Sequence, residues 1–262
     1  MEQIIESDYK REITHSDYSD AHKKIKRGGW SRVLNLHITE NKITFLKEEL
    51  GLKGGLLKAN DKFIEFGTSP HITPIWVGGV FFAALILIIS GGIKFPNELN
   101  TVQFIIPLII SLSCLLFFVI YYFTIPKKEE IWNREDGLVT FPGLMWQKDV
   151  TMQIEKIMFL MSAPSHTGGG AYILQIRRPD HGYTPHLAPI GGQNCYEDLS
   201  YLLWYMDKSR PLPPGDIFDA YRERDYERRK AAGFPPPLFQ STFDTPEATP
   251  EQQQERERIG GW

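Results

Sequence analysis

Two long uncharged apolar runs constrain this chain more than any other feature. No charged residue occurs in 72–93, and none occurs in 99–126. Each run exceeds the ~20 residues that an α-helix needs to cross ~30 Å of hydrocarbon. The short polar stretch "GGIKFPNELN" at 91–100 stands between them. The sequence therefore predicts two transmembrane helices joined by a tight turn outside the membrane.

Basic residues near the helix ends predict the orientation of this hairpin, because positively charged flanks tend to remain cytoplasmic. The connector holds one basic residue, Lys94. Each outer flank holds three: Lys53, Lys58 and Lys62 before the first helix, and Lys127, Lys128 and Arg134 after the second. Both termini are therefore expected in the cytoplasm. The acidic start "MEQIIESD" predicts no cleaved signal peptide.

The composition of the predicted helices favours an anchor over a transporter. The polar groups at membrane depth are few: Ser90, Ser111, Ser113 and Cys114. Trp76 near the start of the first helix is expected at one membrane interface with Tyr121 and Tyr122 near the end of the second. Gly79 and Ala83 could pack against the Ser111 region or mediate dimerisation, which leaves a homo-oligomer open.

The segments on both sides of the hairpin carry strand patterns. "RVLNLHIT" and "NKITFL" around a Glu40-Asn41 turn resemble a β-hairpin, and "DKFIEFG" at 61–67 adds one more strand. Downstream, Asp136-Gly137 lies between two apolar alternations, a strong signal for a hairpin with a type I′ turn. The stretches "VTMQIEKIMFLMS", "AYILQIRRPD" and "GYTPHLAPIGG" continue the pattern, so we expect a β-meander.

A helix is expected after these strands, and a different kind of chain follows it. In "NCYEDLSYLLWYMDK", Asn194 can cap the helix, Glu197 can complete a capping box, and one face carries Tyr196, Leu199, Leu203 and Met206. "RPLPPG" then favours an extended linker, and a short charged helix is expected from Ile217 to Ala232. The last twenty or so residues, rich in Pro, Glu and Gln, are expected to be loosely ordered.

The predicted organisation follows directly from these patterns. In chain order, it comprises a polar N-terminal segment (1–29), an N-terminal β segment (30–71), transmembrane helix 1 (72–93), an external turn (94–101), transmembrane helix 2 (102–126), a β-rich cytoplasmic domain with a terminal helix (127–208), and a Pro-rich, charged C-terminal arm (209–262).

Three groups of residues could contribute to binding or catalysis. A basic cluster could contact anionic lipid headgroups, although a solvated charge run is the alternative: Lys23, Lys24, Lys26 and Arg27. The arm carries apolar residues that need a partner or the protein's own domain to cover them: Ile217, Phe218, Phe234, Leu238 and Phe239. Ser165, His166 and Cys195 lack the motif context of a hydrolase, so no catalytic residue, cofactor site or metal site is predicted.

Two resemblances add to this interpretation. Strands followed by one helix, beside a membrane hairpin, resemble the pleckstrin-homology-like domains of small bacterial membrane proteins, over 129–208 with strands from 30–67. "MDKSRPLPPGDIFDAYRERDYERRKAAGFPPPLF" and "TPEATPEQQQERERIGGW" resemble the tail of an uncharacterised family of bacterial inner-membrane proteins, some encoded near type VI secretion effector genes. That resemblance implies an inner-membrane location and association with effector or immunity loci, and it transfers no catalytic residue.

The fold expected from the sequence is a membrane-anchored α+β protein, with a two-helix hairpin and a mainly β, pleckstrin-homology-like cytoplasmic domain closed by a helix. We expect it to bind the lipid bilayer and a protein partner, and not nucleic acid, through its cytoplasmic domain and arm. An effector-associated or immunity-type role is the first hypothesis. An accessory or scaffolding subunit of another membrane complex is the alternative, and a membrane-bound hydrolase is the third.

Overall fold

The computed structural model describes residues 11–18, 31–39, 43–50, 55–96, 101–162, 172–179, 185–188 and 194–262. They form two compact units. The helical unit comprises Thr68–Lys128 and Met145–Lys148, and the sheet unit takes its residues from Met1–Gly67, Glu129–Leu144 and Asp149–Trp262. The chain therefore passes from one unit to the other four times. The whole is an α+β protein with two long apolar helices and a sheet-rich domain.

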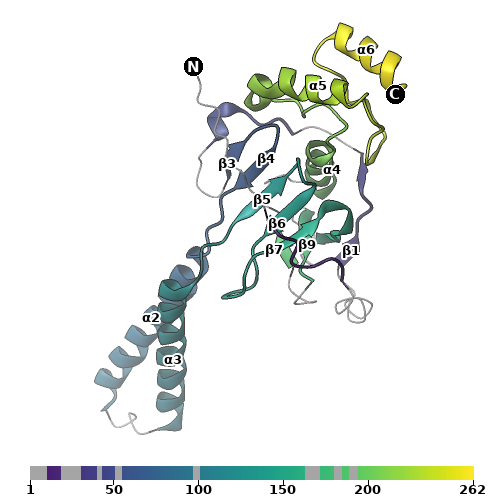
Figure 1. Ribbon diagram of the computed structural model, residues 1–262. Coiled ribbons are helices and arrows are strands. Elements are labelled where there is room, and N and C mark those ends of the chain that lie inside the picture. The colour runs from purple at the N-terminus through teal and green to yellow at the C-terminus, as the bar shows by residue number, and fades with distance from the viewer. Residues whose placement is uncertain are drawn as a thin grey trace. The chain divides into compact units, whose positions relative to one another are not determined.

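The helical unit is an antiparallel pair, α2 (Ile72–Lys94) and α3 (Val102–Thr124) (Figure 1). Only 11% of the most apolar stretch of each helix is buried, so neither resembles the core helix of a soluble protein. Both are long and apolar enough to span a membrane. The bounds differ slightly from the predicted ones: Lys94, placed in the external turn by the sequence, is the last residue of α2.

The larger sheet is an antiparallel meander of five strands: β3 (Leu56–Ala59), β4 (Phe63–Phe66), β5 (Glu130–Asn133), β6 (Leu138–Phe141) and β7 (Val150–Gln153). Neighbours in this sheet are also neighbours in sequence, except that the whole helical hairpin lies between β4 and β5. These two strands still pair directly, with Phe63 opposite Asn133 and Phe66 opposite Glu130. The prediction that strands before the hairpin join the later strands in one body is confirmed.

The hairpin expected at Asp136-Gly137 is present, with a different turn. Asn133 pairs with Leu138, so β5 and β6 are joined by four residues, 134–137, and not by the two-residue type I′ turn. The Asn133 Oδ1 atom accepts from the Asp136 backbone N–H at 3.0 Å, which closes the loop locally. Gly137 has φ +70°, a left-handed conformation that glycine adopts without steric cost.

A second, four-stranded antiparallel sheet has the order β1 (Ser31–Val33), β8 (Phe159–Ser162), β9 (Ile173–Arg177) and β10 (Pro185–Leu187). The prediction of an N-terminal β-hairpin around 31–46 is wrong. β1 pairs with β8, and β2 (His37–Ile38) pairs in parallel with β11 (Gln240–Ser241). Local alternation identified strand-forming stretches, but it does not specify partners that lie far away in sequence.

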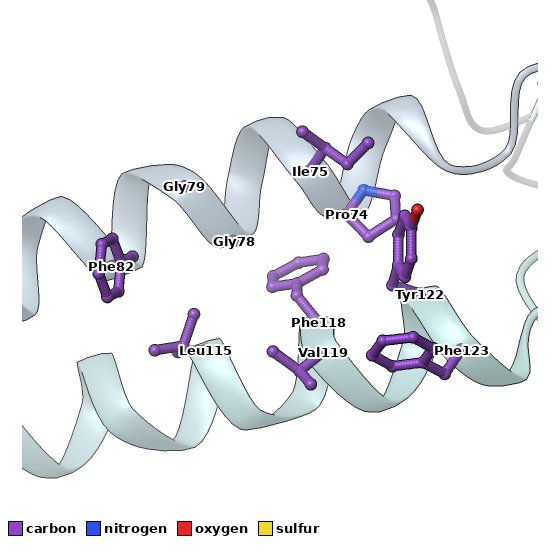
Figure 2. Close-up of a pocket in the computed structure, with 10 residues that line it drawn as sticks. All are labelled: Pro74, Ile75, Gly78, Gly79, Phe82, Leu115, Phe118, Val119, Tyr122 and Phe123. Carbon is purple, nitrogen blue, oxygen red and sulfur yellow. The ribbon is translucent and has the colours of Figure 1, made fainter.

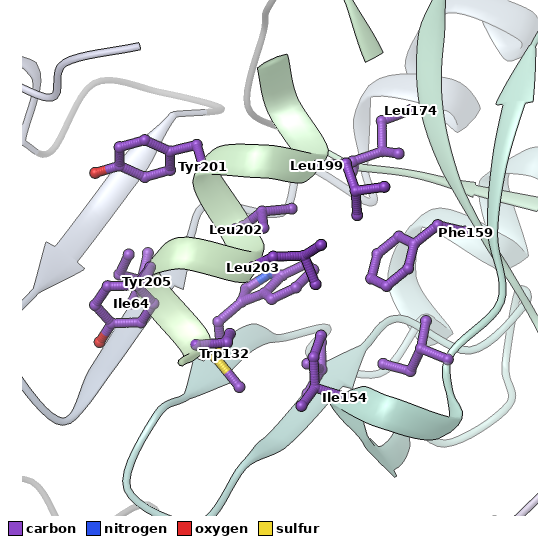
Figure 3. Close-up of a cluster of buried hydrophobic side chains, with 14 of the residues drawn as sticks. Ile64, Trp132, Ile154, Phe159, Leu174, Leu199, Tyr201, Leu202, Leu203 and Tyr205 are labelled. Atoms are coloured by element: carbon purple, nitrogen blue, oxygen red, sulfur yellow. The ribbon is translucent and has the colours of Figure 1, made fainter. Parts of the chain in front are cut away.

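Helix α4 (Cys195–Met206) occupies the centre of the sheet unit. As predicted, Asn194 caps it: the side chain accepts from the Tyr196 backbone N–H at 3.0 Å. The prediction of one apolar face is incomplete, because α4 is covered on several sides. In Figure 3, Leu199 points toward Phe159 and Leu174, whereas Tyr201 and Tyr205 project from another side of the helix.

The C-terminal arm covers part of α4. It contains the 3₁₀ helix η4 (Asp216–Tyr221), α5 (Arg222–Ala231), β11 and α6 (Pro250–Gly260). The ring of Phe218 stacks on Tyr205 with centroids 5.7 Å apart, and Phe243 meets Trp204 edge to face at 5.6 Å. The expectation of loose order near the C-terminus is wrong, because α6 begins at a Thr249 cap and its Arg256 is buried.

Candidate functional site: the membrane hairpin and the arm

Gly78, and not Gly79, is the glycine of this pair that lies next to α3. A Cβ atom added to Gly78 would lie 3.4 Å from the Phe118 Cβ atom, whereas one added to Gly79 would meet no described atom within 4 Å. The rings of Phe81 and Phe118 stack with centroids 6.3 Å apart. The glycine that faces α3 is therefore one position earlier than the sequence pattern suggested, and a Cβ atom there would make an ordinary van der Waals contact.

An apolar groove of about 330 Å³ lies between the two helices. Figure 2 shows Pro74, Gly78 and Phe82 on α2 facing Leu115, Phe118 and Tyr122 on α3. The Tyr122 hydroxyl is the one side-chain polar group among the residues that line it. Such a lining suits a hydrocarbon chain and offers almost nothing to hold a polar substrate.

The three predicted interface residues lie at the same end of the hairpin, in different surroundings. The Trp76 side chain is 74% exposed, as expected of a residue that faces lipid. The Tyr122 ring lies 5.0 Å from the His71 ring. Tyr121 is buried, because the Trp146 ring packs against it with centroids 4.9 Å apart. Their contact with the membrane interface stays a prediction.

Trp146 was missed by the sequence analysis. It lies between β6 and β7, far along the chain from α3, and its ring meets Phe117 edge to face at 5.7 Å. Its indole N–H donates to the Thr124 Oγ1 atom at 2.8 Å. The available signal was the apolar tip "GLMW" in a segment between two strands, where polar turn residues are the rule.

The structure places four of the five proposed partner-binding residues inside the sheet unit. Ile217, Phe218, Phe234 and Phe239 are buried against the protein's own residues. Leu238 alone is exposed, at 47%. Of the two alternatives for covering these side chains, the protein's own domain applies to the four buried ones, because the arm folds back onto the domain from which it extends.

A chain of buried ion pairs connects the arm to the larger sheet. The Arg134 Nη1 atom, next to β5, lies 3.0 Å from the Asp225 Oδ1 atom. The Asp225 Oδ2 atom accepts from the Arg229 Nε atom at 2.9 Å, and Arg229 makes a bidentate pair with Glu247 at 2.6 and 2.7 Å. Glu247 also meets Arg256 of α6 at 3.2 Å. All five side chains are buried, so the elements of the arm are tied together by charge as well as by apolar packing.

Burial and charge act in opposite directions in this network. Burial alone would raise the pKa of Asp225, but the attraction of Arg134, Arg229 and Arg228 keeps that pKa below its ordinary value. Burial lowers the pKa of Arg134, and Asp225 partly restores it. Burial would also lower the pKa of Arg229, but its hydrogen bond to Glu247 and the charge of Asp225 raise it.

We therefore expect the arm to be sensitive to acid. A carboxyl group whose pKa is depressed in the folded state stabilises that state above its unfolded pKa of ~3.9, and this stabilisation is lost as the pH falls through the folded pKa. Thermal unfolding of the protein and of Asp225→Asn should be compared from about pH 7 to about pH 3. The difference between their melting temperatures should become smaller in the acidic range. A difference that does not change with pH would contradict the depressed pKa of Asp225.

Trp262 packs against one end of this network of ion pairs. The Arg256 guanidinium lies over the Trp262 ring, 4.4 Å from its centroid. The Trp262 indole N–H donates to the Phe234 backbone oxygen at 3.0 Å. Phe234 has φ +49°, an uncommon conformation for a residue with a side chain, and its contacts with Trp262 and the Tyr226 ring hold it in place.

The remaining predicted residues are placed as follows. The basic cluster Lys23, Lys24, Lys26 and Arg27, together with Ser165 and His166, lies outside the described residues. Cys195 is a fully buried thiol at the start of α4. Among the described residues, no group of three His, Cys, Asp or Glu side chains could hold a metal ion.

Comparisons with known proteins give no relatives for this arrangement. No protein-family model matches the chain, and neither the curated proteins nor the solved structures contain a match.

Proposed function

We propose that this chain is a two-pass protein of the bacterial inner membrane that binds a protein partner through its sheet unit, with both termini in the cytoplasm. The insertion of the apolar hairpin between the paired strands β4 and β5 carries this proposal. Because α2 and α3 interrupt its sheet, the sheet unit stays attached to the membrane surface for as long as these helices span the bilayer. Catalysis is not part of the proposed role.

A pleckstrin-homology-like body is the fold that we propose for the sheet unit. Its support is the order of the elements: an antiparallel meander from β3 to β7, a second antiparallel sheet with β8, β9 and β10, and then α4. The added strand β1 and the arm depart from that simple pattern. These additions leave the fold assignment a proposal.

The outer face of the four-stranded sheet is our candidate surface for the partner. The strand register places Val33 opposite Leu160, Leu160 opposite Gln175, and Gln175 opposite Leu187. Residues opposite each other in a sheet point to the same face, so these four share one face with Ile173. Val33, Ile173 and Leu187 are exposed, although they are apolar, whereas Leu160 on the same face is buried. An apolar sheet face suits a protein partner better than a small polar ligand.

The orientation of the hairpin can be tested by labelling in whole cells. In a background with Cys114→Ser and Cys195→Ala, a membrane-impermeant maleimide should label Asn97→Cys and leave Ile259→Cys unlabelled. The basic residues that flank the hairpin on its outer sides are the physical reason. Ile259 is exposed, so disruption of the cells should make it reactive. Labelling of Ile259→Cys in intact cells would refute the proposed topology.

The partner can be sought with a photo-crosslinking amino acid at Leu187, with Asp219 in the arm as an exposed polar control. A specific adduct in native membranes from position 187 and none from 219 is expected. A secreted toxin as the partner would favour an immunity-type role, and a subunit of a membrane complex would favour the accessory role. An adduct with a second copy of this chain, or none, would contradict the assignment of this face.

A further inference from the structure

The segment between β6 and β7 is built unlike an ordinary connection. It reads "PGLMWQKD" at 142–149, with apolar residues at its tip where turn residues are usual. Trp146 is 43% exposed even though one side of its ring is packed. Met145 has φ +49°, a conformation that costs energy for a residue with a side chain. The surrounding contacts must therefore hold this tip in place.

Trp146 and Gln147 make contacts with α3 and with Lys128, which follows it. Met145–Lys148 belongs to the helical unit, whereas the residues just before and after it belong to the sheet unit. Trp146 packs on Phe117 and Tyr121 and donates a hydrogen bond to Thr124. The Lys128 ammonium group donates to the Gln147 backbone oxygen.

The strand order explains how this segment reaches α3. Adjacent antiparallel strands alternate in direction, so the 142–149 segment leaves the sheet at the end where β4 finishes and β5 begins. That is also the end from which the chain enters α2 and leaves α3. The 134–137 turn between β5 and β6 lies at the opposite end of the same strands.

The depth of the contact along α3 points to the bilayer. Phe117 precedes Thr124, the last residue of α3, by about two helical turns, or roughly 10 Å. A helix of 23 residues is about 35 Å long, only slightly more than the ~30 Å hydrocarbon core. A ring that packs between Phe117 and Thr124 therefore lies at the hydrocarbon boundary. Indole is enriched at that boundary, because its ring is apolar and its N–H needs a partner.

We propose that the 142–149 segment contacts the membrane in addition to α2 and α3, with Met145 and Trp146 in the boundary between headgroups and acyl chains beside the C-terminal end of α3. The partner of this surface is the lipid of that leaflet. The exposed Lys148 would lie next to the headgroups, where a basic residue is favourable. The inference depends on the proposed membrane placement of α2 and α3.

Depth-dependent fluorescence quenching of the full chain tests this proposal. In the background without native cysteines, an environment-sensitive fluorophore is attached to Leu144→Cys, and the protein is reconstituted into phosphatidylethanolamine and phosphatidylglycerol vesicles. Lipids with a nitroxide high on the acyl chain serve as the quencher. Two matched controls are Leu87→Cys, exposed on α2, and Glu135→Cys, exposed in the 134–137 turn at the other end of the sheet.

We expect position 144 to be quenched several-fold more strongly than position 135, and Trp146→Ser to reduce that quenching toward the level of position 135. Equal, weak quenching at 144 and 135, with strong quenching at 87, would overturn the membrane contact of the 142–149 segment and leave the membrane placement of α2 and α3 intact. Weak quenching at 87 as well would overturn the membrane placement, and with it this proposal.

Discussion

Deleting the arm, residues 209–262, is expected to destabilise the sheet unit and not to free a binding surface. The deletion removes the buried side chains of Ile217, Phe218, Phe234 and Phe239, and it uncovers Tyr205 of α4, on which Phe218 stacks. Burying four large apolar side chains contributes about 6 to 12 kcal/mol. That is comparable with the ~5–15 kcal/mol by which a whole domain is stable. Limited proteolysis of detergent-purified full-length and truncated chains, side by side, measures the effect.

The same reasoning separates the buried residues of the arm from its exposed one. Phe234→Ser with Phe239→Ser should lower the melting temperature strongly, because each change leaves a cavity lined by apolar groups and introduces a hydroxyl. Leu238→Ser, between them in the exposed stretch, should change it little. A truncated chain as resistant to protease as the full chain, or equal effects at 234 and 238, would restore the view that the arm is an independent binding element.

Asp225→Ala is expected to lower the free energy of unfolding by about 3–5 kcal/mol, the usual cost of leaving a buried charge without its partner. Asp225 is the carboxylate between Arg134 and Arg229, and both guanidinium groups would stay buried after its removal. Chemical denaturation of the purified protein in detergent, followed by circular dichroism, measures the change.

The arm supplies a matched control for this change. Asp219 forms an ion pair with Arg222 at 2.9 Å, so it is also an aspartate paired with an arginine, but its side chain is largely exposed. Exposed pairs contribute about 0–1 kcal/mol, so Asp219→Ala should have a small effect. Comparable losses at 219 and 225 would show that the buried network does not hold the arm in place.

Features built from residues close together in sequence could be predicted from it, and contacts between residues far apart in sequence could not. The two apolar helices, the hairpin at Asp136-Gly137 and the Asn194 cap rest on neighbouring residues, and all three are present. Asp225 and Arg229 lie four residues apart on α5, a spacing at which opposite charges meet on a helix surface, and they form an ion pair. Arg134 and Glu247, the other partners of these two residues, are distant in sequence, and no local pattern connects them.

The arm shows the same limit more strongly. Its prolines and charges resemble the composition of a disordered segment, because composition records the charges and not their pairing. The five buried charged residues form ion pairs with one another only once α5, α6 and the turn after β5 have come together. The apolar tip at Trp146 was missed for a similar reason. Its ring packs on α3, and both β5 and β6 lie between α3 and this tip in the sequence.

The insertion of α2 and α3 between β4 and β5 has a consequence for how the protein is made. Within the larger sheet, β3 and β4 are synthesised first, and their neighbour β5 emerges only after both helices have left the ribosome. Closing so long a loop in water carries an entropic cost that rises with the logarithm of its length. On the proposed membrane placement, a helical pair that assembles during insertion would bring Gly67 and Glu129 together before the sheet forms, and so would remove much of that cost. Until then the open edge of β4 can pair with other chains, and we expect slow insertion, more than weak packing, to divert this protein into aggregates.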